Sequence, residues 1–223
     1  MGVTIHLERP RGQPLFCLES LVWAGKPAGG ILEWLLQGSA KTLQCLDFIH
    51  CPKRELLCHL LSNYGRNLRS LRLRVVGAIP TRQLGELKLS ETCAELEEVM
   101  VNDAVGENLL FDLPSSVQHF AFQPSRMMPL WSWDGMEDWI ESRKKLKVIT
   151  LSGHVVAPFR SPVRGFDRNG NSDKTSEIVM AWAEACKKHQ IRLDIAKYGS
   201  ECFWNDGLEE DYRSPIVKNR KYQ

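Results

Sequence analysis

Two histidines and two cysteines lie within the ten-residue stretch HCPKRELLCH, where they could bind a metal ion: His50, Cys51, Cys58 and His59. Imidazole and thiolate groups are the ligands that structural zinc prefers, usually as pairs two to four residues apart. Here six residues separate Cys51 from Cys58, and Cys58 lies among leucines at helical spacing. The spacing argues against a zinc site, and we expect the protein to carry no metal and no other cofactor.

Two further groups of residues could in principle support catalysis. Ser152 and His154 are close in the sequence, but no acidic residue can be assigned to orient the histidine. Gly29 and Gly30 precede a helical pattern without the rest of a phosphate-binding fingerprint. The sequence also lacks a nucleophile elbow, a phosphate-binding loop and a zinc-protease motif. Because catalysis needs several converging groups, we predict that the protein is not an enzyme.

A cluster of arginines raises the possibility of nucleic-acid binding. The cluster consists of Arg66, Arg69, Arg72 and Arg74. The next strand-like segment carries Glu95, Glu97 and Glu98, and opposite charges on adjacent strands stabilise each other. We therefore interpret the arginines as half of a charge-paired surface and expect no binding to nucleic acid.

Composition and charge are those of an ordinary globular domain. The chain has 223 residues with a formal net charge of +2, of which 43% are hydrophobic and 25% charged. No apolar run approaches the roughly 18–20 residues of a membrane span, so no membrane association is expected. The first residues, MGVTIHLERP, lack the basic and apolar regions of a signal peptide. Seven cysteines, an odd number, and the absence of an N-x-S/T site favour a reducing compartment, either the cytoplasm or the nucleus.

The elements that would position these residues are indicated by a recurring six-residue pattern. In LRSLRL, at residues 68–73, leucines occupy the first, fourth and sixth places, which is the strand signature of a leucine-rich repeat. Apolar residues occupy the same places at 18–23, 43–48, 96–101, 117–122 and 146–151. The five intervals between these segments are 25, 25, 28, 21 and 29 residues, all within the usual range of such repeats. Six hexamers at concordant intervals form a specific signal, whereas one alone would be weak.

The segments between the hexamers predict helices that return the chain to the next strand. AGGILEWLLQG and PKRELLCHLLSNYG place apolar residues at helical spacing and end at Gly38 and Gly65. WDGMEDWIESRKKL begins with a capping box at Asp134 and directs Trp139 toward the core. The 21-residue interval is too short for a full helix, and we expect Pro114 to make a tight turn there.

The predicted fold is therefore an α/β leucine-rich-repeat solenoid with irregular repeats of 21–29 residues. It is expected to be curved, with parallel strands on the concave face, and to form a single domain over residues 1–200. The region 154–174 predicts a long loop, followed by a helix over about 175–189 and a capping strand near 190–195. The region 201–223 predicts a polar tail.

The irregular repeat lengths, phrases such as DLPSSVQHFAF and RKKLKVITLSG, and the closing ACKKHQIRLDI together resemble fungal F-box proteins with leucine-rich repeats. The resemblance covers roughly residues 15–196. It implies the substrate-recognition region of a ubiquitin-ligase adaptor. The F-box itself, the helical module of that family that docks to a cullin-ligase adaptor, is not seen in this sequence. Binding to that adaptor is therefore expected only if an F-box exists outside this chain.

The function that follows is a non-catalytic protein-interaction module that binds its partner on the concave face and is otherwise a monomer. An alternative is a free-standing, degenerate leucine-rich-repeat scaffold or inhibitor. A small enzyme on a repeat scaffold is less favoured. In each hexamer the inward residues are the fourth and the sixth, so the third and fifth residues, and the seventh that follows the hexamer, should face the partner. The predicted binding residues are Val22, Asp47, Ile49, Arg72, Arg74, Glu98, Met100, His119 and Thr150.

Overall fold

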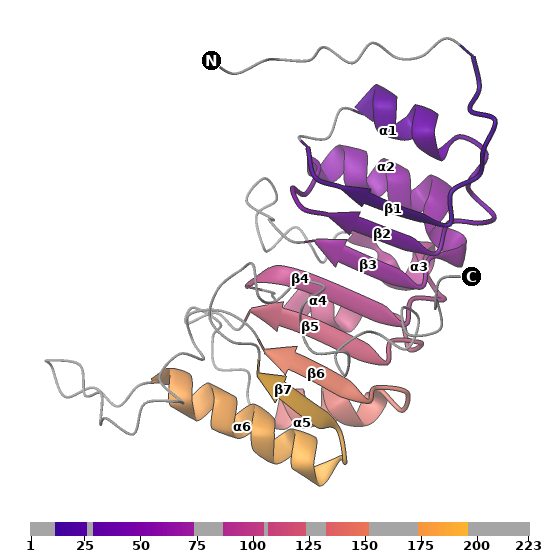
Figure 1. The fold of residues 1–223 in the computed structure, drawn as a ribbon. Coiled ribbons are helices and arrows are strands. Elements are labelled where there is room, and N and C mark those ends of the chain that lie inside the picture. The colour runs from indigo at the N-terminus through magenta and orange to yellow at the C-terminus, as the bar shows by residue number, and fades with distance from the viewer. Residues whose placement is uncertain are drawn as a thin grey trace, which may run out of the picture.

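A computed structural model describes the chain over residues 12–25, 29–73, 87–104, 107–123, 133–151 and 174–195. Seven strands within these ranges form one parallel sheet, in which every strand lies beside the next one in sequence (Figure 1). They are β1 (Ser20–Trp23), β2 (Cys45–Phe48), β3 (Ser70–Leu73), β4 (Glu98–Ala104), β5 (His119–Gln123), β6 (Val148–Leu151) and β7 (Arg192–Ile195). The protein is thus an α/β protein built on a single parallel sheet.

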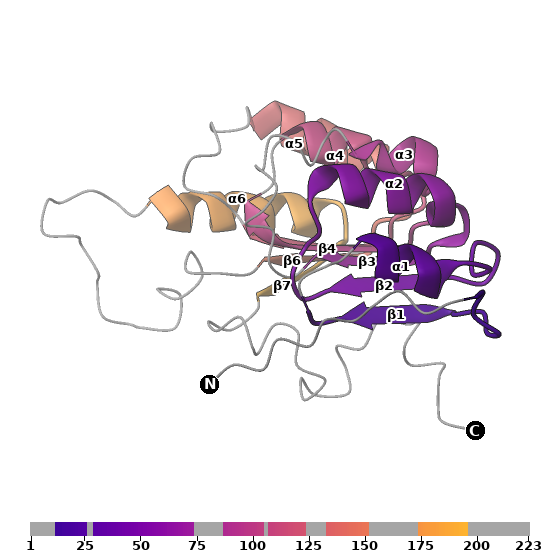
Figure 2. The same cartoon turned by 90° about the horizontal axis from the view of Figure 1, so that it is seen from above.

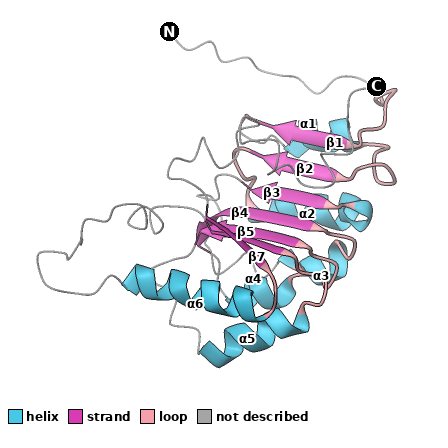
Figure 3. Ribbon diagram, turned by 60° about the horizontal axis from the view of Figure 1, so that its bottom comes forward, coloured by secondary structure: helices cyan, strands magenta, loops and turns pink. Residues whose placement is uncertain are grey.

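Within the described ranges, six α-helices connect the strands. They are α1 (Gly29–Leu36), α2 (Arg54–Tyr64), α3 (Leu89–Thr92), α4 (Glu107–Asp112), α5 (Trp133–Ser142) and α6 (Lys174–Lys188), with a short 3-10 turn after α2 at Gly65–Asn67. Figures 2 and 3 show these helices on one side of the sheet. A parallel sheet needs such crossovers, because each strand must return to the same end before it can pair in parallel with the next.

Each of the first six strands lies within one of the predicted hexamers, apart from the C-terminal extensions of β4 and β5. The hexamers are also aligned across the sheet. The fourth residue of each one is paired with the fourth residue of the next, from Leu21 through Leu46 and Leu71 to Ile149. Because of this alignment, the fourth residues form one continuous apolar row on the helix-facing side of the sheet, and the sixth residues form another.

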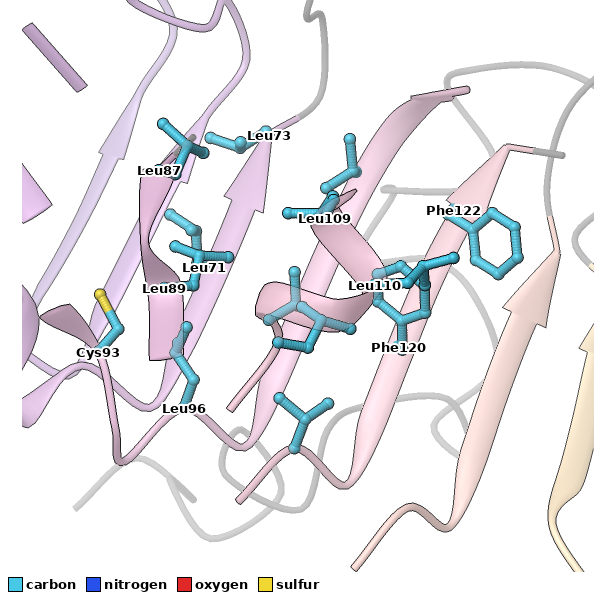
Figure 4. Close-up of a cluster of buried hydrophobic side chains, with 14 of the residues drawn as sticks. Leu71, Leu73, Leu87, Leu89, Cys93, Leu96, Leu109, Leu110, Phe120 and Phe122 are labelled. Carbon is cyan, nitrogen blue, oxygen red and sulfur yellow. The ribbon is translucent and has the colours of Figure 1, made fainter. Parts of the chain in front are cut away.

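The core lies between the sheet and the helices. The fourth and sixth hexamer residues of β2 to β6 are all at most 1% exposed, which confirms the predicted register; they are Leu46, Phe48, Leu71, Leu73, Val99, Val101, Phe120, Phe122, Ile149 and Leu151. Figure 4 shows part of this core, where side chains of α3 and α4 pack against those of β3 and β5. In β1 the corresponding residues, Leu21 and Trp23, are only half-buried, because β1 is the edge strand of the described sheet.

Side chains from the following repeat form hydrogen bonds with backbone groups of the two shortest described helices, α3 and α4. α4 has six residues and occupies the 21-residue interval just before Pro114, where we expected a turn without a full helix. Asp112, at the end of α4, accepts hydrogen bonds from the Leu89 backbone N–H at 2.7 Å and the Ser90 hydroxyl at 3.0 Å, at the start of α3. A carboxylate in this position satisfies N–H groups that a helix start leaves unpaired.

The end of α4 is satisfied in the same way by α5 and the residue that follows it. Arg143 donates hydrogen bonds to the carbonyls of Leu110 at 3.1 Å and Phe111 at 3.2 Å, and also to that of Leu113. The indole N–H of Trp139 donates to the Leu110 carbonyl at 2.8 Å. Helices this short are unstable alone, so their backbone groups depend on these contacts between repeats.

At Gly65, where α2 meets the next repeat, there is no room for a side chain. A Cβ at this position would lie 2.6 Å from Cys93 Sγ and 2.8 Å from the Thr92 carbonyl oxygen. Since its φ of −74° suits any residue, the cost of Gly65→Ala is steric. We expect this substitution to lower the free energy of unfolding by about 1–3 kcal/mol in urea titrations. The control is Gly30→Ala in α1, where no atom lies within 4 Å and stability should not fall.

Two predicted regions fall almost entirely outside the described residues. They are the loop over 154–174, of which only Lys174 is described as the first residue of α6, and the tail over 201–223. The helix predicted near 175–189 corresponds to α6, and the strand predicted near 190–195 corresponds to β7.

Candidate interaction surface

The face of the sheet opposite the helices, which we call the front face, carries two straight rows of side chains. The strand pairing places the third residue of every hexamer in one row: Ser20, Cys45, Ser70, Glu98, His119 and Val148, continued by Arg192 on β7. The second row contains the fifth residues: Val22, Asp47, Arg72, Met100, Ala121 and Thr150, continued by Asp194. Seven of the nine predicted binding residues belong to these two rows.

The centre of the front face is buried, which contradicts the expectation that residues between the inward positions face solvent. The exposed fractions are 2% for Asp47, 3% for Ser70, 1% for Glu98, 0% for Ala121 and 9% for Thr150. Exposure rises at the two edges of the sheet. Val22 on β1 is 58% exposed, and the side chain of Arg192 on β7 is 57% exposed.

Glu98 is the hub of a polar network at this centre. Its Oε1 atom accepts hydrogen bonds from Ser70 Oγ at 2.8 Å and from Arg72 Nε at 2.7 Å, both on the neighbouring strand β3. Its Oε2 atom is buried and lies 3.8 Å from Nδ1 of His119 on β5, too far for a hydrogen bond. His119 Nε2 in turn lies 2.9 Å from Thr150 Oγ1 on β6. The network therefore joins four adjacent strands.

Charge and burial act against each other in this network. Burial alone would raise the pKa of Glu98, but the adjacent His119 and Arg72 outweigh it and hold that pKa well below its usual range. Burial would lower the pKa of Arg72, but the Glu98 carboxylate reverses the shift and raises it. Both groups are consequently ionised at neutral pH. Beside them, burial raises the pKa of the Cys45 thiol, which therefore remains protonated.

The arginine cluster is paired with the glutamates of the next strand, as the sequence suggested. Arg69, the residue before β3, forms a partly exposed ion pair with Glu97. Arg72, within β3, forms an ion pair with Glu98. The structure thus confirms the charge-paired interpretation for these two arginines. Arg74 is outside the described residues.

The remaining predicted binding residues differ in how accessible they are. Ile49, directly after β2, and Met100 on β4 are half-buried, and Val22 is exposed. We expected Arg72 to be an accessible anchor. Only 18% of its side chain is exposed, and it forms an ion pair with Glu98. Sequence reasoning also missed Ser70 as a network member. A serine beside an arginine in a strand carries no signal that it will bind a glutamate 28 residues later.

The four residues first considered as zinc ligands do not converge. Cys51 is buried, and burial raises its thiol pKa to about 12, whereas His50 is exposed. His59 is exposed on α2, with Nε2 3.1 Å from Asn63 Nδ2 and 3.5 Å from Glu33 Oε1. Among the described residues, no three His, Cys, Asp or Glu side chains are placed to hold a metal ion. The six described cysteines are free thiols.

Comparisons with known proteins identified no relative of this chain. No family model, curated protein or solved structure matches the chain. In the described part of the chain, no helix has the length and apolar character needed to cross a membrane.

Proposed function

We propose that the protein is a leucine-rich-repeat solenoid whose front face, as the concave face, binds another protein. The observation that carries this proposal is the alignment of six hexamers in one sheet, which displays two straight rows of side chains on a single face. Repeats that stack in this manner build extended surfaces suited to binding proteins. In this interpretation the protein acts as a monomer in the cytoplasm or nucleus.

Binding is favoured over catalysis by the state of the polar groups. The ionised side chains Glu98 and Arg72 are bonded to each other, and His119 lies within 2.9 Å of Thr150. Groups that satisfy one another stabilise the surface, whereas an enzyme needs convergent groups directed at a substrate. The more accessible residues beside this network include apolar ones, Val22, Ile49 and Met100, which are typical of the anchors in protein interfaces.

We further propose, from the resemblance alone, that this interaction module is the substrate-recognition region of an F-box-type ubiquitin-ligase adaptor. The alternative is a free-standing scaffold or inhibitor with degenerate repeats. The test is co-purification of the longest natural form of the protein with the cullin-ligase adaptor. Recovery of a stoichiometric complex would support the F-box proposal. A natural form that folds but does not bind the adaptor would favour the scaffold.

The binding role of the front face predicts a specific loss of affinity. We expect the double variant Val22→Glu with Met100→Ala to weaken binding of the partner by about 2 kcal/mol, or roughly 30-fold, because it removes one exposed and one half-buried apolar contact. Arg72 is unsuitable for this test because its loss would disturb the Glu98 network. The measurement is titration of the purified partner, recovered with the unaltered protein, against each variant.

The matched control changes the helix side. Lys53→Glu with Glu55→Ala alters two exposed residues at the start of α2 and should leave affinity unchanged. Equal thermal midpoints for the three proteins would exclude unfolding as the cause. If the α2 variant loses the partner and the front-face variant keeps it, the binding surface lies on the helices, and the proposal is wrong.

A further inference from the structure

The turns that lead into the described strands lie along one edge of the sheet, because these strands are parallel and start on the same side (Figure 1). The charge of this edge changes from repeat to repeat. The turn before β3 carries Arg66 and Arg69, and the neighbouring turn before β4 carries Glu95 and Glu97. Opposite charges on these adjacent turns offset each other.

The turn before β6 has no acidic neighbour of this kind. Its sequence, RKKLK at residues 143–147, has four cations in five residues. The turn before β5, LPSSVQ at residues 113–118, carries no charge. On the other side, residues 187–192 read KKHQIR and contain no acidic residue. We call residues 143–147 and 187–192 together the basic rim.

The two segments of the basic rim lie side by side. The Arg192 N–H donates a hydrogen bond to the Lys147 carbonyl at 2.9 Å, and the rings of Trp139 on α5 and Trp182 on α6 are 6.3 Å apart. Neighbouring strands are about 4.8 Å apart, which is less than the Debye length of about 8 Å at physiological ionic strength. Like charges on adjacent strands repel, so the basic rim lowers the stability of the fold unless anionic groups lie close to it.

Some cations of the basic rim have a role within the described structure. Lys188 forms an ion pair with Glu137, and Arg192 forms one with Asp194 at 3.0 Å. Arg143 donates hydrogen bonds to carbonyls of α4. Four exposed lysines take part in no ion pair with another described residue: Lys144, Lys145, Lys147 and Lys187.

The dipoles of the helices account for Lys187 but not for the other three lysines. A cation is favoured in the last turn of a helix, and this effect falls off beyond that turn. Lys187 lies in the last turn of α6. Because α5 ends at Ser142 with no basic residue in its last turn, Lys144, Lys145 and Lys147 lie beyond it. Their positive charge is therefore left for an anionic ligand to neutralise.

We propose that the basic rim binds an acidic segment of the protein partner, with several Asp or Glu side chains in succession. The proposal rests on the proposed function and names the chemistry of the partner. The basic rim is continuous with the front face, because Val148 and Arg192, in its first row, directly follow Lys147 and Ile191. A partner bound to the front face can therefore place such a segment on the basic rim. Charge complementarity of this kind speeds association and selects among partners.

A short acidic peptide fits this surface better than nucleic acid or an anionic membrane. Asp138 and Glu141 are exposed on α5, and Glu184 is exposed on α6. These carboxylates belong to the same two helices that end at the basic rim, and they would repel a long phosphate backbone or a charged bilayer. A peptide of a few residues can bind the basic rim without approaching them.

The experiment measures binding of a fluorescein-labelled peptide that carries a run of glutamates, by fluorescence anisotropy with the full chain. Lys144→Glu, Lys145→Glu and Lys147→Glu in one chain should weaken binding by about 10-fold or more, because three attractive contacts become repulsive. Binding by the unaltered protein should fall as salt is added. The same peptide with glutamine in place of glutamate should not bind.

The matched control produces the same change in net charge elsewhere on the surface. Lys41→Glu, Lys53→Glu and Arg66→Glu alter exposed residues of the earlier repeats and should leave peptide affinity within about 2-fold. An equal loss in both variants would mean that the peptide senses only overall charge, and the proposal would be wrong. If the charge-reversed rim does not fold, Lys144→Gln with Lys145→Gln and Lys147→Gln should still weaken binding by about 3-fold or more.

The alternative ligands have distinct outcomes, each of which would overturn the proposal. Tighter binding to oligothymidylate or to phosphatidylserine vesicles than to the peptide, lost in the Lys144, Lys145 and Lys147 variant, would identify nucleic acid or a membrane. Stronger peptide binding after Glu209→Gln, Glu210→Gln and Asp211→Asn would identify the acidic run of this same chain as the ligand.

Titration of the purified partner completes the test. The charge-reversed rim should weaken partner binding at low salt and have a smaller effect at high salt. Unchanged partner affinity at low salt would mean that the partner does not use the basic rim. The peptide measurement needs no partner, so it can succeed where Val22→Glu with Met100→Ala leaves partner binding intact and only the front-face function fails.

Discussion

Replacing Arg72 with methionine should lower the free energy of unfolding at pH 7 by about 3–5 kcal/mol, the usual cost of removing one member of a buried ion pair. Glu98 would then keep its charge at 1% exposure and lose its 2.7 Å hydrogen bond from Arg72 Nε. Methionine retains most of the volume of the arginine stem. The loss would therefore report mainly on the uncompensated carboxylate, and it can be measured by urea unfolding.

Arg69→Met is the matched control on the same strand segment. Arg69 also pairs with a glutamate of the next repeat, Glu97, but its side chain is 47% exposed. Exposed pairs contribute about 0–1 kcal/mol, so we expect a correspondingly small loss. If the Arg72 and Arg69 variants lose the same stability, Glu98 is not the buried hub that the geometry indicates.

The pH dependence of the Arg72→Met effect has a definite sign. The pKa of Glu98 is lower in the folded protein than in the unfolded chain, where the pKa of a glutamate is about 4.3. The stabilising contribution is therefore present above that pH and is lost as the pH falls through and below it. In the variant, protonation of Glu98 relieves the uncompensated charge. The stability difference between the two proteins should thus narrow below about pH 4.

Phe120→Ala should cost about 3–5 kcal/mol, because it opens a cavity at the junction of β5 with α5. Phe120 is fully buried; its ring stacks on Phe122 with centroids 4.9 Å apart and lies 6.2 Å from the Trp139 ring. Trp182 on α6 completes the cluster, 5.4 Å from Phe122 and 6.3 Å from Trp139. Loss of the phenyl ring therefore removes contacts on several elements at once.

Phe16→Ala is the control for this aromatic substitution. Phe16 is 42% exposed and makes an edge-on contact with Trp34, with centroids 6.1 Å apart. We expect its removal to cost less than about 1 kcal/mol by the same unfolding measurement. A loss at Phe16 equal to that at Phe120 would mean that the core does not lie where the buried residues place it.

The strands and the long helices could be predicted because their signals are local. A hexamer such as that at 68–73 directs its fourth and sixth residues inward through the two-residue period of a strand, and Leu71 and Leu73 are indeed buried. Trp139 was likewise expected in the core from its place on the apolar face of a helix, and it is 2% exposed.

The contacts that complete the structure could not be predicted, because they join residues far apart in the sequence. Asp112 contacts the start of α3, 23 residues earlier, and no local pattern distinguishes it from a solvated aspartate. The burial of Asp47 and Glu98 was missed for a related reason. The period of a strand divides its residues between two faces, but it carries no information about what covers either face.

The contacts around α4 have a consequence for how the chain can change in length. The start of α3 depends on Asp112, and the end of α4 depends on Arg143. Deleting one of these units would leave carbonyl or N–H groups of its neighbour without partners. A change in the number of units within the segment from α3 to α5 should therefore destabilise the units that remain beside the change.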